Sequence, residues 1–430
     1  MNLIKGKNLL LFSLAAETFL ASYGLLLGGQ TAIVSVLYLI AGLLFIFTML
    51  MMPAARLPQL HEIKNEFRQK LPIGVIMLLM AYITASYWLD LIPLDPDFAD
   101  MLPVMKVMNE RFLHGDWKQV YDPIPEIWNG TRPIYLPAMW LPYSTAIVLH
   151  VDMRWVTVGA VLLSFMIILI LIRIKKNRYF GYGQIMVGAL LFWWIFSRNE
   201  VHSLISMSEE GIVIFYFVVL SLAIISGNAL LMGITASLCL LSRYSMIGWL
   251  IPCLLFFTIR KDFRKLAIFS ATGIICCLLL FLIPFGFKTL EQMIDLPGNY
   301  VAFAKHVWEY SPEVYWLNPG LAKFYGPRRM AILHQTLVIM SFGIPFLFMF
   351  FCLLQKKWKL QNINLACFKL SLLVFYQFID VPYGYLFYTC SFVSLVIAAV
   401  LLGDENSDEK LKSKKLSTAN CQLPAANKKP

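Results

Sequence analysis

The sequence predicts an all-α polytopic membrane protein with about twelve transmembrane helices. Of its 430 residues, 59% are hydrophobic and only 14% are charged, far outside the range of soluble globular proteins. The apolar residues also come in runs of roughly the 20 residues that cross a bilayer. We therefore expect one transmembrane bundle over residues 1–402 and a disordered cytosolic tail over residues 403–430.

The net charge of +11 does not by itself indicate a nucleic-acid partner. Lys and Arg lie mainly in short loops between apolar runs, where they set the orientation of helices in a membrane. We predict no nucleic-acid binding, a plasma or inner membrane location and two cytosolic termini. The eight cysteines form no CxxC pair and the six histidines have no ligand spacing, so the sequence predicts no disulfide framework and no metal site.

The first three spans are predicted over residues 9–28, 31–52 and 72–93. Lys5 and Lys7 place the N-terminus in the cytosol, and the first two spans form a hairpin around Gly28-Gly29-Gln30. The basic loop that follows returns to the cytosol. The third span therefore ends on the exoplasmic side, where it leads into a long loop over residues 95–153.

This first exoplasmic loop should begin with a helix over residues 97–114. One apolar stripe recurs at steps of three and four residues: Phe98, Met101, Met105, Met108 and Phe112. Charged residues populate the other faces, so the helix should lie along the membrane surface. The apolar run 133–151 contains three prolines and is predicted as a broken, partly embedded helix that does not cross.

The remaining spans follow the alternation of apolar runs and basic loops. They are predicted near residues 154–174, 184–197, 208–226, 229–258, 266–285, 331–354, 362–382 and 384–402. The run 229–258 is too long for one span, and we divide it at Ser242-Arg243-Tyr244-Ser245, on the outer side. A second long exoplasmic loop is expected over residues 286–330.

Four aspartates follow the third span within a few positions: Asp90, Asp95, Asp97 and Asp100. Charged groups at the membrane boundary are costly unless they have a partner or a function. Asp97 lies at the predicted N-cap of the surface helix and Asp100 in its first turn, so both also fit a helix-capping role. Either carboxylate is a candidate for a general base.

Several cations should face the same outer space. They are Arg132, Arg198, His202, Arg243, Lys305, His306, Arg328 and Arg329. Fixed cations around a carboxylate suit a substrate that carries a phosphate and reacts with a hydroxyl to be deprotonated. Each also fits a solvated loop charge, although Arg243 interrupts a strongly apolar run and Arg132 adjoins the proline-broken helix.

Aromatic residues are frequent in the same loop: Trp117, Tyr121, Trp128, Tyr135, Trp140 and Tyr143. Their rings can stack on sugars. Tyr and Trp also form the aromatic belts at both membrane interfaces, and this interfacial role fits most of these residues equally well.

The order of features over residues 97–143 resembles the GT-C superfamily of membrane glycosyltransferases, and within it the polyprenyl-phosphate-sugar-dependent enzymes related to glycosyltransferase family 87. The matching segments are Asp97-Phe98-Ala99-Asp100, Arg111-Phe112-Leu113-His114-Gly115, Val120-Tyr121-Asp122-Pro123, Tyr135-Leu136-Pro137 and Leu141-Pro142-Tyr143. Family members often have Tyr-Pro-Pro at Tyr135-Leu136-Pro137 and aromatic residues at Met101-Leu102-Pro103. The choice between Asp97 and Asp100, and the identity of the sugar, therefore stay open.

The resemblance implies inverting transfer of a hexose or pentose, with mannose-like sugars among the candidates, from a polyprenyl-phosphate donor. The acceptor would be a hydroxyl of a glycan or glycolipid on the exoplasmic face, and no metal or other cofactor is implied. Asp100, or else Asp97, would act as the general base. The residues implied to bind the donor phosphate are Arg132, Arg243, His202 and Arg328. Those implied to contact the sugar or acceptor are Tyr121, Tyr135 and Trp140.

Two other classes of protein remain open. About twelve spans with cytosolic termini also fit a secondary transporter or a flippase for an envelope precursor. Transporters place ionisable groups at the midplane within related repeats, whereas here these groups gather in two exoplasmic loops and no repeat is visible. Asp380-Val381-Pro382 is the feature that best fits a transporter. The third class is a non-catalytic partner in an envelope-polysaccharide complex.

Overall fold

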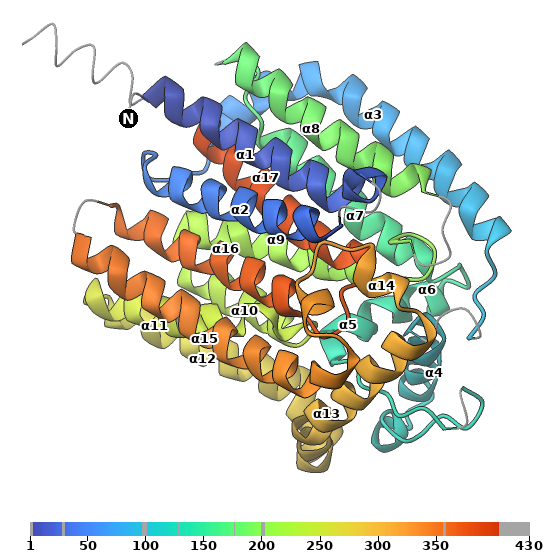
Figure 1. Cartoon of the computed structure of the whole chain (residues 1–430). Helices are drawn as coiled ribbons and strands as arrows, with labels where there is room; N and C mark the ends of the chain where they lie inside the picture. Colours follow the sequence, from blue (N-terminus) through green and yellow to red (C-terminus); the bar gives the residue numbers. More distant parts are fainter. Residues whose placement is uncertain are drawn as a thin grey trace, which may run out of the picture.

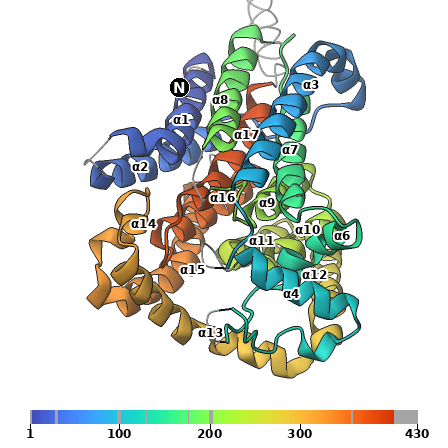
Figure 2. The same cartoon turned by 90° about the vertical axis from the view of Figure 1, so that its right-hand side faces the viewer.

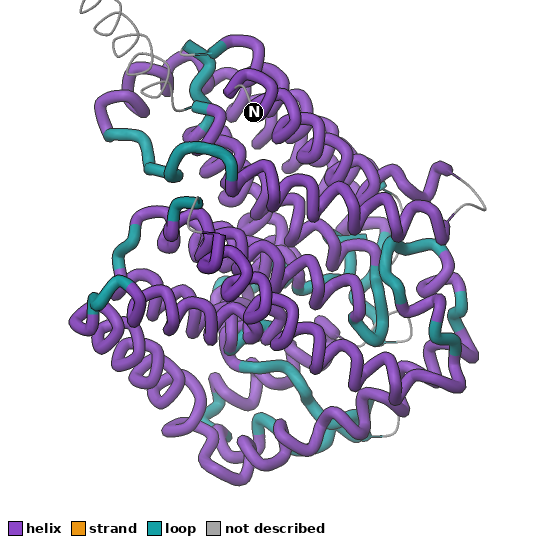
Figure 3. The backbone as a smooth tube through the Cα atoms, turned by 60° about the vertical axis from the view of Figure 1, so that its left-hand side comes forward, coloured by secondary structure: helices purple, strands orange, loops and turns teal. Residues whose placement is uncertain are grey.

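The computed structural model describes residues 3–27, 31–96, 101–127, 130–175, 177–198, 203–355 and 358–403. Within these ranges the chain forms 17 α-helices and no β-strand, with one isolated bridge between Ile124 and Thr131. Figure 3 shows these helices joined by short loops. Seven helical segments of the described chain are long and apolar enough to cross a membrane. The all-α, multi-pass part of the sequence prediction is confirmed.

The seven long apolar segments are Ala32–Leu50, Glu66–Leu91, Arg154–Leu171, Arg178–Ser197, Phe263–Met293, Pro327–Gln355 and Gly384–Leu402. They belong to helices α2 (Thr31–Leu50), α3 (Leu60–Leu91), α7 (Arg154–Leu171), α8 (Arg178–Ser197), α12 (Phe263–Cys277) with the start of α13 (Ile283–Tyr310), α15 (Met330–Gln355) and α17 (Tyr388–Leu402). Three shorter apolar segments accompany them: α9 (Glu210–Ser226), α10 (Ala229–Leu240) and Tyr244–Ile259, which contains α11 (Ile247–Ile259).

Helix α17 lies at the centre of this bundle. All its residues are buried, and it packs against α1 (Leu3–Tyr23), α7, α8 and α9. The neighbouring α16 (Leu360–Phe378) is also almost wholly buried and packs on α2, α11 and α15. Helix α3 is mostly exposed along its apolar stretch, as expected of a helix that faces lipid.

The two predicted exoplasmic loops gather at one end of the bundle. Figure 1 shows α4 (Met101–Leu113), α5 (Pro137–Trp140), α6 (Ser144–Val148), α13 and α14 (Glu313–Trp316) at the end away from the N-terminus, and Figure 2 looks onto that end. The Phe285 ring joins the two loops, because its centroid lies 5.3 Å from that of Tyr121 and 5.8 Å from that of Trp140.

A helix within the predicted range 97–114 is confirmed as α4, which begins at Met101 in the described chain, whereas its place along the membrane surface stays a prediction. Its buried side chains include Met105 and Met108 of the predicted stripe, whereas Phe98 lies outside the described residues. The run 133–151 is confirmed as broken: α5, a single 3-10 turn and α6 follow one another as short pieces, each too short to cross a membrane.

The predicted division of the run 229–258 is also confirmed. Helix α10 ends at Leu240, Arg243 is extended with φ −152°, and helical structure resumes at Tyr244. Residues 286–330 were expected as a loop, but α13 continues through them to Tyr310 after a break at Gly286, where φ is +77°. This non-helical conformation strongly favours glycine, so one helix ends at the kink and a second continues from it to Tyr310.

Candidate functional site

Five polar side chains meet inside the bundle, and we call them the polar cluster: Glu209, Glu210, Arg243, Tyr376 and Thr389. Arg243 Nη2 donates to Glu209 Oε1 at 2.8 Å and forms an ion pair with Glu210 Oε2 at 3.0 Å. Glu210 Oε1 accepts hydrogen bonds from the Tyr376 hydroxyl at 3.1 Å and from Thr389 Oγ1 at 2.7 Å. One guanidinium is thus surrounded by two adjacent carboxylates.

The ends of four helices bring the polar cluster together. Glu209 and Glu210 begin α9, where the positive end of the helix dipole favours negative charge. Arg243 follows the end of α10, Tyr376 belongs to the last turn of α16, and Thr389 to the first turn of α17. The four ends belong to helices that all contact α9 or α16. The cluster therefore lies at a helix boundary and away from the middle of the spans.

The polar cluster is buried but not fully bonded. The exposed fraction is 3% for the Glu209 side chain, 0% for Glu210 and 15% for Arg243. Within the described part of the chain, Glu209 Oε2 and Arg243 Nε have no hydrogen-bond partner. Buried polar atoms almost always have a partner, so such orphan atoms suggest that water or a ligand completes the site.

A second pair lies beside the polar cluster. His334 Nδ1, in the first turns of α15, lies 2.6 Å from Asp380 Oδ2, two residues past the end of α16. Asp380 is buried and His334 is partly exposed. The Tyr300 hydroxyl of α13 lies within electrostatic range of both Arg243 and Asp380, and burial raises its pKa above the usual value. The His334–Asp380 pair and the polar cluster therefore both lie near Tyr300.

Two further buried polar groups are close to these residues in the sequence. Gln377 follows Tyr376 in α16, and neither its Nε2 nor its Oε1 has a hydrogen-bond partner among the described residues. Asp380 Oδ1 is likewise buried and has no hydrogen-bond partner among the described residues. The chain around the end of α16 thus adds three unpartnered polar atoms to the three of the polar cluster, which are Glu209 Oε2, Glu210 Oε2 and Arg243 Nε.

The predicted general bases, Asp97 and Asp100, and the predicted phosphate ligand His202 all lie outside the described residues. The chain just before the aspartates is firmly held. Arg154 donates to the backbone carbonyls of Ile92 at 2.6 Å and Leu89 at 2.9 Å, and pairs with Asp152 at 2.6 Å. These bonds fix the end of α3, from which the acidic segment starts.

The other predicted phosphate ligands are not brought together. Arg132 and Arg328 are exposed, and neither takes part in the hydrogen bonds and ion pairs described above for the polar cluster. Arg243 belongs to the cluster, but its Nη2 already contacts two carboxylates. A phosphate at Arg243 would have to compete with both of them.

The three predicted sugar-contacting aromatics do meet. The Tyr121 hydroxyl donates to the Tyr135 carbonyl at 3.1 Å and accepts from Trp140 Nε1 at 3.3 Å. Trp140 is fully buried, with the Phe112 ring at 5.5 Å in an edge contact, and burial raises the pKa of Tyr121. These bonds give Tyr121 and Trp140 a packing role in the structure, and sugar contact by the three remains a prediction.

Sequence reasoning missed Glu209, Glu210, Gln377 and His334 as site residues, and treated Asp380 only as a feature of a possible transporter. The signal was present for the two glutamates: adjacent carboxylates stand directly before an apolar run on the predicted outer side. The other residues needed the fold, because nothing local joins Gln377 or His334 to a helix far away in the sequence.

A different buried ion pair lies within the bundle. Lys369 Nζ of α16 lies 2.5 Å from Glu17 Oε1 of α1, and both side chains are wholly inaccessible to solvent. Lys369 also donates to the Cys390 carbonyl at 2.8 Å, and Glu17 Oε2 accepts from Ser394 Oγ at 2.9 Å. Unlike the polar cluster, this pair has partners for its charged oxygens, as a buried pair that stabilises packing should.

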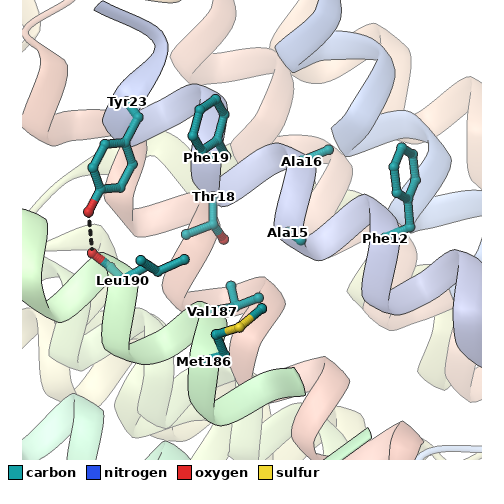
Figure 4. Close-up of a pocket in the computed structure, with 9 residues that line it drawn as sticks. All are labelled: Phe12, Ala15, Ala16, Thr18, Phe19, Tyr23, Met186, Val187 and Leu190. Atoms are coloured by element: carbon teal, nitrogen blue, oxygen red, sulfur yellow. Dashed lines mark hydrogen bonds between the residues drawn. The ribbon is translucent and has the colours of Figure 1, made fainter. Parts of the chain in front are cut away.

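An apolar groove of about 290 Å³ runs between α1 and α8. Figure 4 shows its lining, with the Tyr23 hydroxyl donating to the Leu190 carbonyl at 3.0 Å. The Tyr23 ring contacts that of Trp194 in a tilted arrangement, with centroids 4.3 Å apart, and the Trp194 indole N–H donates to the Tyr388 hydroxyl at 2.8 Å. Tyr388 directly precedes Thr389 of the polar cluster, so α17 connects the groove with the site.

Among the described residues no group of three or more His, Cys, Asp and Glu side chains is suited to hold a metal ion. The residues that the structure brings together are therefore a buried polar site and an apolar groove, without a metal centre in the part described. Comparison of the chain with protein families, curated proteins and solved structures finds no match.

Proposed function

We propose that the protein is a membrane glycosyltransferase that moves one sugar from a polyprenyl-phosphate donor to an acceptor hydroxyl of a glycan or glycolipid. The reaction takes place on the exoplasmic face. The proposal starts from the resemblance of residues 97–143 to GT-C enzymes and draws support from the way the two loop segments and the polar cluster are arranged.

The proposed topology has about twelve spans. It adds to the seven long segments the three shorter apolar helices and the helices α1 and α16, which carry Glu17 and Lys369. Alternating crossings then place the basic segments around Arg173 and Arg260 in the cytosol, as the positive-inside rule requires. The ends of α3 and α16, and with them the polar cluster, face the exoplasmic side.

One observation carries the proposal: buried polar atoms without partners lie where helix ends meet, at residues 209–210, 243 and 377–380. On the proposed topology this is also the side of the surface helix α4 and the broken segment 133–151. A polar site near the membrane boundary, next to an apolar groove, suits a substrate with a sugar head and an isoprenoid tail.

The reaction follows from the residues in simple steps. Asp100, or else Asp97, accepts the proton of the acceptor hydroxyl as its oxygen attacks the anomeric carbon. The bond from that carbon to the phosphate oxygen breaks, which inverts the configuration. Arg132, Arg328 and His202 stabilise the negative charge of the leaving polyprenyl phosphate. The groove between α1 and α8 offers an apolar surface for the isoprenoid chain.

The direct test is transfer by the purified protein. Polyprenyl-phosphate donors charged with radiolabelled mannose, glucose, galactose or arabinose would be supplied in turn with a membrane glycolipid extract. The proposal expects labelled product from at least one donor and none from the matching nucleotide sugars. Absence of product with every lipid donor, from protein that remains folded, would contradict it.

A secondary transporter is the second candidate, and the Glu17–Lys369 pair favours it. Ionisable groups inside a bundle of spans often mark ion or proton pathways. Uptake of a labelled lipid-linked precursor into proteoliposomes, abolished by Lys369→Met in a variant that still folds, would support this class. Sugar transfer by the same variant at the wild-type rate would assign the pair to packing alone.

A further inference from the structure

We propose that the polar cluster, together with Gln377 and Asp380, binds the hydroxyl groups of the sugar and leaves the phosphate to other residues. This inference rests on the proposed function and names the part of the substrate that the buried site takes. It also changes the role of Arg243, which the resemblance implied to be a phosphate ligand.

The orphan atoms match a polyhydroxyl ligand. Glu210 Oε2 is held in the ion pair with Arg243. Of the other orphan atoms, two are donors, Arg243 Nε and Gln377 Nε2, and three are acceptors, Glu209 Oε2, Asp380 Oδ1 and Gln377 Oε1, each without a partner in the described chain. A sugar hydroxyl both donates and accepts, so neighbouring hydroxyls can satisfy such a mixed set. A phosphate only accepts, and it would leave the three acceptors unpaired.

The charge of the site also favours a neutral sugar over a phosphate. Three buried carboxylates, from Glu209, Glu210 and Asp380, stand near one permanent cation, Arg243, whose Nη2 already contacts two of them. The His334 ring pairs with the third carboxylate. A phosphate would add negative charge to a buried site that already holds an excess of carboxylates, which is costly. A neutral sugar adds none.

Tyrosine rings near the polar cluster could supply the apolar contacts of a sugar subsite. The rings of Tyr383 and Tyr385 stack with centroids 5.6 Å apart and an interplanar angle of 4°. Tyr385 lies within electrostatic range of Glu209 and Arg243, and Tyr300 within range of Arg243 and Asp380. Aromatic faces beside carboxylate, amide and guanidinium groups supply both the apolar and the polar contacts of a pyranose ring.

The site is also reachable on one side. Arg243 keeps 15% of its side chain exposed, whereas the carboxylates that hold it are 3% and 0% exposed. The guanidinium thus lies between the buried carboxylates and the accessible space. A sugar that enters past the exposed part of Arg243 would reach its buried Nε and the buried orphan carboxylate oxygens.

The test separates the sugar from the phosphate. Thermal unfolding of the purified full-length protein in detergent would be followed with bare polyprenyl phosphate and with polyprenyl phosphate charged with mannose, glucose, galactose or arabinose. We expect the bare lipid to raise the melting temperature and one charged lipid to raise it further. That further shift, which we call the sugar increment, reports on the sugar subsite alone.

Glu209→Gln and Gln377→Met should each abolish the sugar increment and leave the shift with bare lipid unchanged. Gln377→Met guards against misfolding, because the side-chain amide that it removes has no hydrogen-bond partner in the described chain. Glu313→Gln, at an exposed position of α14, is the matched control and should keep both shifts.

A sugar increment that survives in both variants would overturn the inference, and so would loss of the bare-lipid shift in either variant that remains folded. If no charged lipid exceeds the bare lipid in the wild type, the subsite is likewise rejected while lipid-phosphate binding stands. If neither bare nor charged lipid shifts the wild type, the proposed function itself fails, and this outcome is distinct from the others.

Discussion

Arg243 donates through Nη2 to Glu209 Oε1 at 2.8 Å, at a point where α10 has just ended and α9 is about to begin. The same nitrogen lies 3.0 Å from Glu210, so two adjacent carboxylates depend on one cation. The break in the run 229–258 therefore places Arg243 where it can contact the two glutamates at the start of α9.

Removal of Arg243 should destabilise the protein strongly. In Arg243→Met two buried carboxylates lose their counter-charge, and loss of one partner of a buried pair costs about 3–5 kcal/mol. Thermal unfolding in detergent would measure the effect. The control is Lys265→Met, which removes the exposed pair with Asp262 and should change stability by less than about 1 kcal/mol. Equal effects of the two changes would contradict the buried geometry.

The Glu17–Lys369 pair predicts strong coupling. Lys369→Met alone should cost about 3–5 kcal/mol, because it strands a buried carboxylate. The double variant Glu17→Leu with Lys369→Met should recover most of that loss, since an apolar pair needs no counter-charge. A double-mutant cycle of unfolding free energies would measure the coupling. Additive losses, with no recovery in the double variant, would show that the two groups do not interact.

Gln377→Met should stabilise the protein in the absence of substrate. Its two amide atoms are buried and unpartnered within the described residues, and a buried unsatisfied polar group costs about 1–3 kcal/mol. The variant should therefore melt at a higher temperature than the wild type while losing sugar transfer. A decrease in stability would show instead that water or another group satisfies this amide in the free protein.

Arg154 is expected to position the acidic segment. Its guanidinium joins Asp152 to two carbonyls at the end of α3, which a lysine cannot do because it lacks the planar fork. Arg154→Lys should lower sugar transfer by about 10²-fold with little change in donor KM, since small misplacement of reacting groups costs about that much. Steady-state kinetics would measure this, and rates equal to wild type would exclude the positioning role.

Local features of the fold could be predicted from the sequence. The steps of three and four residues predict α4, the prolines of 133–151 predict a broken helix, and Ser242-Arg243-Tyr244-Ser245 predicts the end of α10. Each depends on neighbouring residues alone. The helix that follows the kink at Gly286 and runs to Tyr310 was not predicted, since a loop was expected beyond the span 266–285.

The site could be predicted only in part. A charge within an apolar run needs a partner, which distinguished Arg243 in the sequence, but its partners Glu209 and Glu210 lie 34 and 33 residues away. Glu210 bonds Tyr376 across 166 residues and Thr389 across 179, and Glu17 pairs with Lys369 across 352. No periodicity or spacing encodes such contacts, because they arise from how whole helices pack.

The central claim is that an exoplasmic aspartate activates the acceptor hydroxyl for attack on a lipid-phosphate sugar. The measurement that tests it most directly is the rate of sugar transfer by purified Asp100→Asn, with Asp97→Asn as its matched partner and membrane insertion checked for both. The account predicts that Asp100→Asn lowers the rate by about 10²-fold or more, the usual contribution of a general base. Transfer at the wild-type rate by both variants would contradict the account.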